Sequence, residues 1–243
     1  MKITTWVKIN NTAVSDQAKS LRLDLVSPGR GLITVLTDEP PKRAQYAEVA
    51  MQLGDNQVQI VFQGFIDQVT HIQARQYRVL VREFSALLNQ RIAINIQHAT
   101  PADILAEISE QTGLVFVLPD SEWTKNDVAR FQHIGGGYGA LDYLLRIFNV
   151  KSPVWHQQPD GRIYVGELEK SLMAGKELRI PAELFSSIST TAGTLPAIPR
   201  LRPGAKINHG TGTKYITAVE VTDNLMRLTW ADNISNKHLQ AIQ

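Results

Sequence analysis

Residues 57–69 (QVQIVFQGFIDQV) show the clearest alternation of apolar and polar side chains in the chain. Ile60 and Phe62 alternate with glutamines, and this period of two indicates a strand with one buried face. Gly64 interrupts the strand, and a glycine at such a position marks a bulge or the close approach of another backbone. We interpret it as a bulge or kink that lets the strand curve around a barrel. Residues 77–83 (YRVLVRE) follow within reach of a hairpin.

The same period recurs in shorter segments through the first 97 residues. Asn10-Asn11 and residues 54–56 (GDN) carry turn residues between such segments. Residues 38–43 (DEPPKR) are too polar to pack a core, which predicts an exposed loop. Together these features indicate an all-β unit, a small barrel or sandwich of about six strands. Besides the two strands above, we expect strands at residues 3–9, 20–26, 32–36, 48–53 and 91–97.

The pattern changes at residue 99, where helical signals begin. Thr100 is a good N-cap, Pro101 suits the first helical position, and Asp103 lies three residues after the cap. Gly113 is typical of the residue that ends a helix. We therefore expect a first helix between Thr100 and Gly113.

The segments that follow this helix predict an α+β middle part. Leucines and a phenylalanine at helical spacing indicate a second helix at residues 140–149. Strands are expected at residues 114–118 and 128–134. A hairpin is expected at residues 154–165, because an Asp-Gly turn at residues 159–161 separates two short apolar runs.

The last third of the chain predicts a connector and a second β unit. We expect a short strand, a short helix, and then an extended linker at residues 190–202, since prolines recur there. Three more strands and a polar, frayed tail complete the chain. The short elements are a strand at residues 178–180, a helix at residues 181–189, strands at residues 205–208, 214–221 and 225–230, and the tail at residues 231–243.

These elements divide the chain into three expected domains. Residues 1–98 are expected to form a first β-barrel domain and residues 99–170 an α+β domain. Residues 171–243 are expected to form the connector and a small C-terminal β domain that packs back on the first barrel. The predicted fold class is therefore mainly β with an α+β middle part.

Composition narrows the range of functions. The 243 residues are 43% hydrophobic and 20% charged, as in an ordinary globular protein, and the net charge of +2 argues against a dedicated nucleic-acid binder. The chain has no cysteine, which excludes disulfides, thiolate nucleophiles and cysteine metal sites. No run of about 18 apolar residues predicts a membrane-spanning helix. Met1-Lys2 leads directly into a polar segment, so no secretory signal is expected.

Candidate catalytic chemistry is weak throughout the sequence. The glycine-rich residues 135–139 precede a helix, as in phosphate-binding loops, but Asp142 stands where the third glycine of that motif belongs. We interpret the segment as a loop and a helix start. The six histidines lack metal-ligand spacing, and no Gly-x-Ser-x-Gly motif is present. The close carboxylate pairs fall on predicted solvent faces. We therefore assign no catalytic residue, no cofactor and no metal.

Two small basic clusters remain as candidates for contact. Arg75, Arg78 and Arg82 form one, and Arg200, Arg202 and Lys206 form the other. Each could touch a phosphate backbone. The alternative for each is a solvated strand face or a salt-bridge partner at a protein interface.

Four stretches follow one another in an order that a known family shares. A strand with a central glycine (residues 61–67) precedes a capped helix (100–114). An aromatic–leucine helix (138–148) and an Asp-Gly hairpin turn (159–161) come next, followed by a Pro-Gly β unit (201–220). In this order they resemble the baseplate hub proteins of tailed bacteriophages. That group includes late-control-D type tail proteins and the hub half of type VI secretion spikes.

The resemblance implies a mechanical role and tube-like β-barrels of the phage hub type. It implies a homotrimer whose pseudo-sixfold ring joins the hexameric tail tube, or a distal tail protein, to a central spike, fibre or tape-measure protein. DNA would meet the protein only in transit through the channel. The resemblance implies a location at the virion tail tip or baseplate, after synthesis in the host bacterial cytoplasm, and it implies no catalytic residues.

Interfaces are therefore the expected functional sites. The candidate contact regions are the strand edges and the loops at residues 38–43 and 190–203, and the candidate interface residues are Arg43, Phe65, Arg200 and Arg202. Two alternatives stay open. A tail-associated hydrolase would require a cleft with convergent carboxylates or a histidine–carboxylate pair. An oligonucleotide-binding β-barrel would require a continuous basic and aromatic strip on one sheet.

Overall fold

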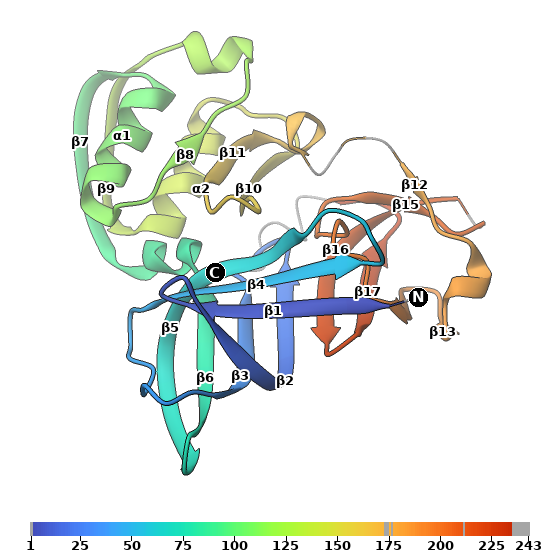
Figure 1. The fold of residues 1–243 in the computed structure, drawn as a ribbon. Helices are drawn as coiled ribbons and strands as arrows, with labels where there is room; N and C mark the ends of the chain where they lie inside the picture. The colour runs from blue at the N-terminus through green and yellow to red at the C-terminus, as the bar shows by residue number, and fades with distance from the viewer. Residues whose placement is uncertain (1, 173–174, 176, 211, 235–243) are drawn as a thin grey trace.

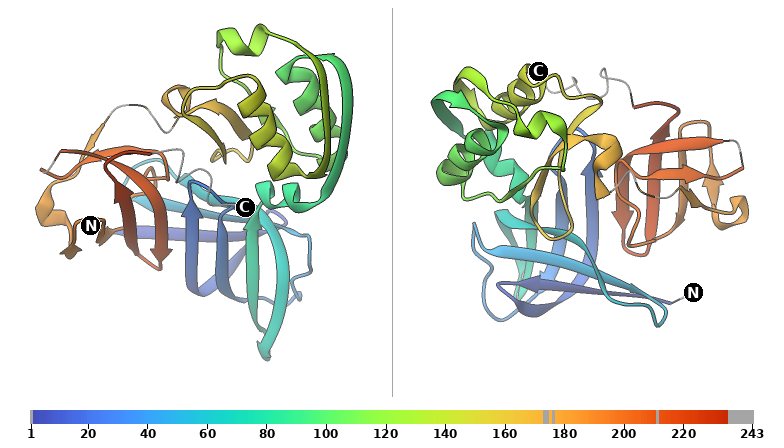
Figure 2. Two further views of the ribbon diagram at one scale, coloured as in Figure 1. Left: turned by 180° about the vertical axis from the view of Figure 1, so that it is seen from behind. Right: turned by 90° about the horizontal axis from the view of Figure 1, so that it is seen from above.

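The computed structural model describes residues 2–172, 175, 177–210 and 212–234 (Figure 1). Its largest element is a sheet to which both the N-terminal and the C-terminal parts of the chain contribute, and a smaller α+β part lies between them in sequence. Figure 2 shows this α+β part above one end of the large sheet, while the β5–β6 hairpin projects from the opposite end. The predicted fold class, mainly β with an α+β middle part, is confirmed.

The first six strands form a closed circuit of antiparallel pairings. β1 pairs with both β4 and β2, so the order β1-β4-β5-β6-β3-β2 returns to its start. Asn10 and Asn11, with φ of 47° and 64°, form the tight turn that lets β2 fold back on β1. The bounds are β1 (Ile3–Ile9), β2 (Thr12–Asp24), β3 (Arg30–Leu36), β4 (Tyr46–Leu53), β5 (Gln59–Gln73) and β6 (Gln76–Glu83).

Gly64 lies in the middle of β5, but the prediction of a bulge at this residue is wrong. Two irregularities flank it instead: the register with β4 skips Val61, and the register with β6 skips Asp67. Gly64 itself pairs regularly with both neighbouring strands. A Cβ on Gly64 would lie 1.8 Å from the backbone oxygen of Arg82. The glycine is therefore present because the backbone of β6 approaches closely, which is the other role of a strand glycine.

β2 is much longer than predicted and connects the closed circuit to the C-terminal strands. Its residues 20–24 pair with β16, whereas its first residues pair with β1. The sheet then continues through β17, β14 and β13, and a short branch carries β15 and β12. The bounds are β12 (Leu178–Arg179), β13 (Ser187–Ile188), β14 (Ala192–Pro196), β15 (Lys206–Asn208), β16 (Thr213–Thr222) and β17 (Leu225–Ala231).

Two expectations for the segment before β15 are wrong. β14 lies inside the predicted linker, where Leu195 is fully buried and the strand pairs with β17 over five residues. The predicted helix at residues 181–189 shrinks to the single 3₁₀ turn η5 (Ala182–Leu184). The prolines misled the prediction because Pro196 occupies the last position of its strand, where the ladder ends.

The α+β part contains an antiparallel ribbon of β7 and β9, two helices and a three-stranded sheet in the order β10-β11-β8. β7 was expected among the strands of the first barrel. This prediction is wrong, because β7 pairs with β9 and not with a strand of the large sheet. The bounds are β7 (Arg91–Ala99), α1 (Pro101–Thr112), β8 (Phe116–Val117), β9 (Val128–Gly136), α2 (Gly137–Ile147), β10 (Pro153–Gln157) and β11 (Ile163–Glu167), with 3₁₀ turns η1 (Phe84–Asn89), η2 (Glu122–Lys125) and η3 (Leu168–Lys170).

The first helix has the ends that its sequence predicts. The Thr100 hydroxyl accepts a hydrogen bond from the Asp103 backbone N–H at 3.2 Å, and the Asp103 carboxylate accepts one from the Thr100 backbone N–H at 3.0 Å. This reciprocal capping box stabilises the N-terminus of α1. Gly113 ends the helix in the left-handed conformation, with φ of 73°.

Buried side chains gather in two main clusters. One fills the closed circuit and continues without interruption beneath the C-terminal strands, so these two parts share a core. The other lies within the α+β part, between the β7–β9 ribbon, the helices and β11.

The domain boundaries at residues 98 and 170 stay predictions. The predicted frayed tail falls mostly on residues 235–243, which lie outside the described residues, and Ala231 belongs to β17. In the described part of the chain, no helix is both long and apolar enough to span a membrane.

Candidate interaction surface and buried junction

The outer face of the large sheet carries a row of arginines across neighbouring strands. Arg22 of β2 lies opposite Arg30 of β3, and Arg30 lies opposite Arg82 of β6. All three side chains are exposed. Together with Tyr138 of α2 they line a shallow hollow of about 420 Å³ between the sheet and the α+β part. The antiparallel register therefore gathers positive charge that is scattered in the sequence.

Most of this charge is balanced locally. Arg22 forms ion pairs with Asp24 at 2.8 Å and with Glu220 at 2.6 Å, and Arg82 lies 2.8 Å from Asp67. Exposed pairs of this kind contribute at most about 1 kcal/mol each. Within the described residues, Arg30 forms no ion pair. The row is thus mixed in charge, unlike the continuous basic strip that binding to a polyanion requires.

The next row of the same face contains three leucines and two hydroxyl side chains. Leu32 of β3 lies opposite Leu80 of β6, and on the other side the row runs through Ser20 and Thr222 to Leu225. Leu32 is 44% exposed and Leu225 is 53% exposed. We name this face, with its arginine row and its leucine row, the outer sheet face. Exposed leucines beside arginines are typical of surfaces that contact another protein.

Arg43 and Phe65, two of the residues predicted to lie at an interface, both lie near one edge of the outer sheet face. The Arg43 guanidinium is 81% exposed and lies 3.7 Å from the Asp67 carboxylate. Phe65 is half-buried and lies opposite Arg82, which binds the same Asp67. The structure therefore brings these two residues to one place, and their interface role stays a prediction.

Arg200 and Arg202 are separated by the structure. Arg200 is exposed, but the Arg202 side chain is only 7% exposed and lies 3.3 Å from Oε1 of Glu83. Arg202 also donates a hydrogen bond to the backbone oxygen of Val61 at 3.0 Å. Its guanidinium thus serves an internal contact and is not available on the surface of this chain.

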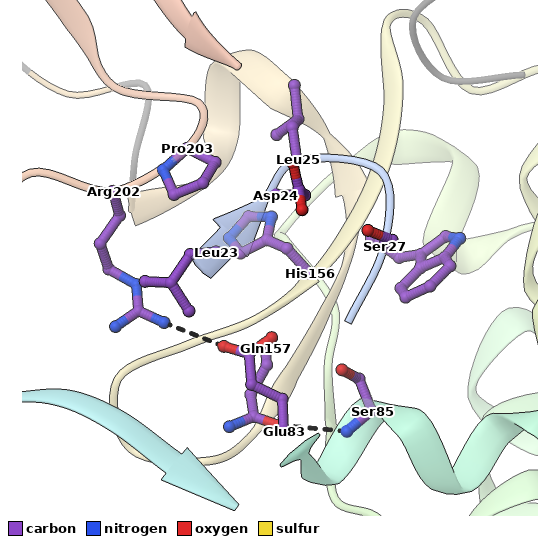
Figure 3. Close-up of a pocket in the computed structure, with 11 residues that line it drawn as sticks. Leu23, Asp24, Leu25, Ser27, Glu83, Ser85, His156, Gln157, Arg202 and Pro203 are labelled. Atoms are coloured by element: carbon purple, nitrogen blue, oxygen red, sulfur yellow. Dashed lines mark hydrogen bonds and ion pairs between the residues drawn. The ribbon is translucent and has the colours of Figure 1, made fainter. Parts of the chain in front are cut away.

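Arg202 belongs to a buried polar junction that joins three parts of the chain (Figure 3). The Glu83 carboxylate, at the end of β6, also accepts a hydrogen bond from the Gly29 backbone N–H at 2.6 Å. Gln157 of β10 donates to the backbone oxygen of Gln63 at 2.9 Å and accepts from the Ser85 backbone N–H at 3.1 Å. Glu83 and Arg202 therefore pair within the large sheet, and Gln157 makes the polar contact between the α+β part and β5.

The charged pair in this junction is shifted by its surroundings. Burial raises the pKa of Glu83, and the positive charge of Arg202 opposes that shift. Burial lowers the pKa of Arg202, which Glu83 opposes in turn. Glu83 was not singled out from the sequence, although a signal for it exists. In the alternating strand of residues 77–83 it shares the inward face with Val79 and Val81, so burial follows from the period of two.

The space at this junction does not suit a substrate. The cavity beside Glu83 and Arg202 has a volume of about 20 Å³, which is room for about one water molecule. Among the described residues, no group of three or more histidine and carboxylate side chains is arranged to hold a metal ion. The glycine-rich segment also has a packing role: a Cβ on Gly137 would lie 2.8 Å from the backbone oxygen of Leu88. The predicted helix start is confirmed, at Gly137, three residues before the predicted position, but the predicted loop is wrong, because Gly135 and Gly136 belong to β9.

Comparison with known sequences gives one distant relative. No family model matches the chain. The chain is 25% identical over 209 residues to an uncharacterized 58.7 kDa protein of Haemophilus phage HP1, and the match covers 86% of this chain. The chain spans 39% of the length of that relative.

Comparison with solved structures is more informative. A 43 kDa tail protein from prophage MuSo2 of Shewanella oneidensis matches with a TM-score of 0.72 and 11% identity, over 95% of this chain and 98% of the other. A tail protein from Neisseria meningitidis matches with a TM-score of 0.69 and 12% identity, over 98% and 99%. An E. coli component of the type VI secretion system, described as similar to the T4 bacteriophage tail proteins gp27 and gp5, matches with a TM-score of 0.63 and 15% identity, over 94% and 77%. The resemblance seen in the sequence is thereby confirmed for the fold: the chain has the fold of phage tail proteins and of this type VI secretion component.

Proposed function

We propose that the protein is a structural hub at the tail tip or baseplate of a tailed phage or prophage. The observation that carries this proposal is the fold shared with a prophage tail protein over 95% of this chain and 98% of that one. A match over nearly the whole length of both chains favours a common mechanical role more strongly than a match to one module would. Fold alone does not specify function, so the proposal requires its own test.

The proposed assembly is a homotrimer with a pseudo-sixfold ring around a channel. The ring would join the hexameric tail tube, or a distal tail protein, to a central spike, fibre or tape-measure protein, and DNA would only pass through it. The outer sheet face supports this, because its exposed leucines and arginines suit a contact between proteins. Identical subunits that meet through two different surfaces close into a ring when the rotation between them closes.

The surface chemistry favours a binding role over a catalytic one. The arginines of the outer sheet face are largely neutralised by Asp24, Asp67 and Glu220. A partner surface with charges of both signs fits this pattern, whereas single-stranded nucleic acid prefers a continuous basic groove. We therefore propose no enzymatic activity and no stable nucleic-acid complex, and we place the protein at the virion tail tip after synthesis in the host bacterial cytoplasm.

The experiment that tests this function is the mass of the purified protein in solution, by light scattering across a range of concentrations. We expect a species of three times the 27.1 kDa chain mass, and negative-stain images of rings with a central opening. A chain that stays monomeric both alone and when mixed with its cognate tail-tube protein would refute the hub. The mixture is needed because ring contacts can depend on the neighbouring layer.

A further inference from the structure

His156 lies inside the buried junction on β10, next to Gln157. Within the described part of the chain, neither of its ring nitrogens has a hydrogen-bond partner, and both are shielded from solvent. Its ring centroid lies 5.4 Å from that of Tyr164 on β11. It also lines the small cavity that Glu83 and Arg202 share. The imidazole is therefore held in a site whose remaining polar groups are already paired.

The charges around His156 disfavour a proton on it. Arg202 lines the same cavity and is positive. The carboxylates at the cavity are committed elsewhere: Glu83 binds Arg202 and the Gly29 N–H, and Asp24 binds Arg22. The Tyr164 hydroxyl donates to the backbone oxygen of Glu167 at 2.7 Å and is not aimed at the histidine. A protonated His156 would thus place a second buried positive charge beside Arg202 without a free counter-charge.

The contact between β10 and the large sheet passes through the same junction. Gln157 connects β10 to Gln63 of β5 and to Ser85 of η1, which follows β6 directly, whereas the Arg202–Glu83 pair lies within the large sheet. Beside them, the apolar cluster in this region has only four buried members, namely Leu25, Val154, Tyr164 and Leu168. His156 therefore lies at a contact between β10 and the large sheet that few buried groups form.

We propose that the junction is an acid-sensitive latch, in which protonation of His156 separates the β10–β11 layer from the large sheet while each part keeps its own core. The step requires only a proton from solvent, which reaches a ring nitrogen when the junction opens. The charged imidazolium then cannot return to its site beside Arg202. The latch is a property of the fold and does not depend on the proposed hub function.

Burial lowers the pKa of His156 from 6.5 to about 4, and the positive charge of Arg202 adds to this shift. The lowered pKa sets the direction of the pH dependence. The closed junction therefore binds a proton less readily than the open one. Above pH 6.5 the equilibrium constant for closing does not change. It falls as the pH drops towards 4, by about 300-fold in all. The raised pKa of Glu83 acts in the opposite sense, because the closed state favours its protonated form. A variant at His156 separates the two effects.

The test is hydrogen exchange of the full chain between pH 7 and pH 4, corrected for the intrinsic pH dependence of amide exchange. The reporter is the amide of Ser85, which donates to Gln157 of β10. The β7–β9 ribbon serves as an internal reference, because it lies within the separate core of the α+β part. We expect the opening constant of the Ser85 amide to rise at least 30-fold more than that of the ribbon amides.

The matched variants are His156→Gln and His71→Gln. His156→Gln should abolish the extra rise in opening, whereas His71→Gln, at an exposed histidine on β5, should keep the wild-type behaviour. If His156→Gln does not fold, the pKa of His156 measured by NMR in the wild-type protein decides. A value near 4 supports the latch, and a value above 6 overturns it. Equal pH dependence of the Ser85 amide and the ribbon amides in the wild type overturns it as well.

Discussion

The close approach of two backbones at Gly64 makes a strong prediction about the variant Gly64→Ala. The added Cβ would lie 1.8 Å from the backbone oxygen of Arg82 and 2.6 Å from its carbonyl carbon. Ordinary van der Waals contact between carbon and oxygen needs more than about 3.2 Å, so β5 and β6 must separate by over about 1 Å. A flexible side chain could yield to the new methyl, but a paired backbone cannot do so without losing its ladder.

The expected cost is large because the clash falls at the centre of the sheet. Gly64 pairs with β4 on one side and β6 on the other, and Phe62 and Ile66 beside it are fully buried. Overpacking of a core costs about 1–3 kcal/mol, and the loss of backbone pairing adds to this. We therefore expect Gly64→Ala to lower the free energy of unfolding by about 4 kcal/mol, or to prevent folding.

The assay is urea denaturation followed by circular dichroism, with Gly136→Ala as the matched control. Gly136 has φ of −70°, which any residue adopts, and among the described residues no atom lies within 4 Å of its added Cβ. Both substitutions reduce the conformational entropy of the unfolded chain by a similar amount, so this effect cancels in the comparison. Gly136 is the N-cap of α2, where alanine is less favourable than glycine, so the control should change stability by less than about 1 kcal/mol. If the free energy of unfolding of Gly64→Ala lies within about 1 kcal/mol of the wild-type value, the close backbone approach is not what excludes a side chain there.

Three further predictions concern a cap, the buried pair and the outer sheet face. Thr100→Ala should cost about 1 kcal/mol in urea denaturation through loss of the capping box, and Thr100→Ser should restore it. Arg202→Met should lower the free energy of unfolding by about 3–5 kcal/mol, because it leaves Glu83 buried without its partner. Adding Glu83→Gln to this variant should recover a large part of that loss. Equal stability of the single and double variants would contradict the pairing. Leu32→Asp should convert the proposed trimer to folded monomers in light scattering, whereas Leu87→Asp, exposed on η1, should leave the mass unchanged.

Signals that depend on neighbouring residues were read correctly from the sequence. The Thr100 cap and the Gly113 helix end depend on backbone conformations that the adjacent residues set, and both have the predicted geometry. The hairpin of β10 and β11 likewise follows from its Asp-Gly turn, where Gly161 has φ of 86°. Period-two segments such as β1 and β6 carry their burial pattern within themselves. These features need no knowledge of distant partners.

Pairing between distant segments could not be read in the same way. A strand pattern states that one face is buried but does not say which strand lies beside it, so β7 was assigned to the wrong sheet. β14 was missed because its strand character comes from its ladder to β17, and its prolines indicate a linker when read alone. The extension of β2 has the same origin, since its polar first half is held by pairing with β1 and β3.

The sequence by itself therefore determined the two α-helices and the caps of the first, the hairpins, the mainly β class and the resemblance to phage hub proteins. It also showed that Gly64 is unusual, although we interpreted it as a bulge or kink and not as the close approach that the structure shows. Only the tertiary structure decided that question, closed the circuit from β1 back to β2, and buried Arg202 against Glu83, 119 residues away in the chain. The physical reason is that local conformation follows from adjacent residues, whereas burial and strand partnership are settled by segments that meet only when the whole chain folds.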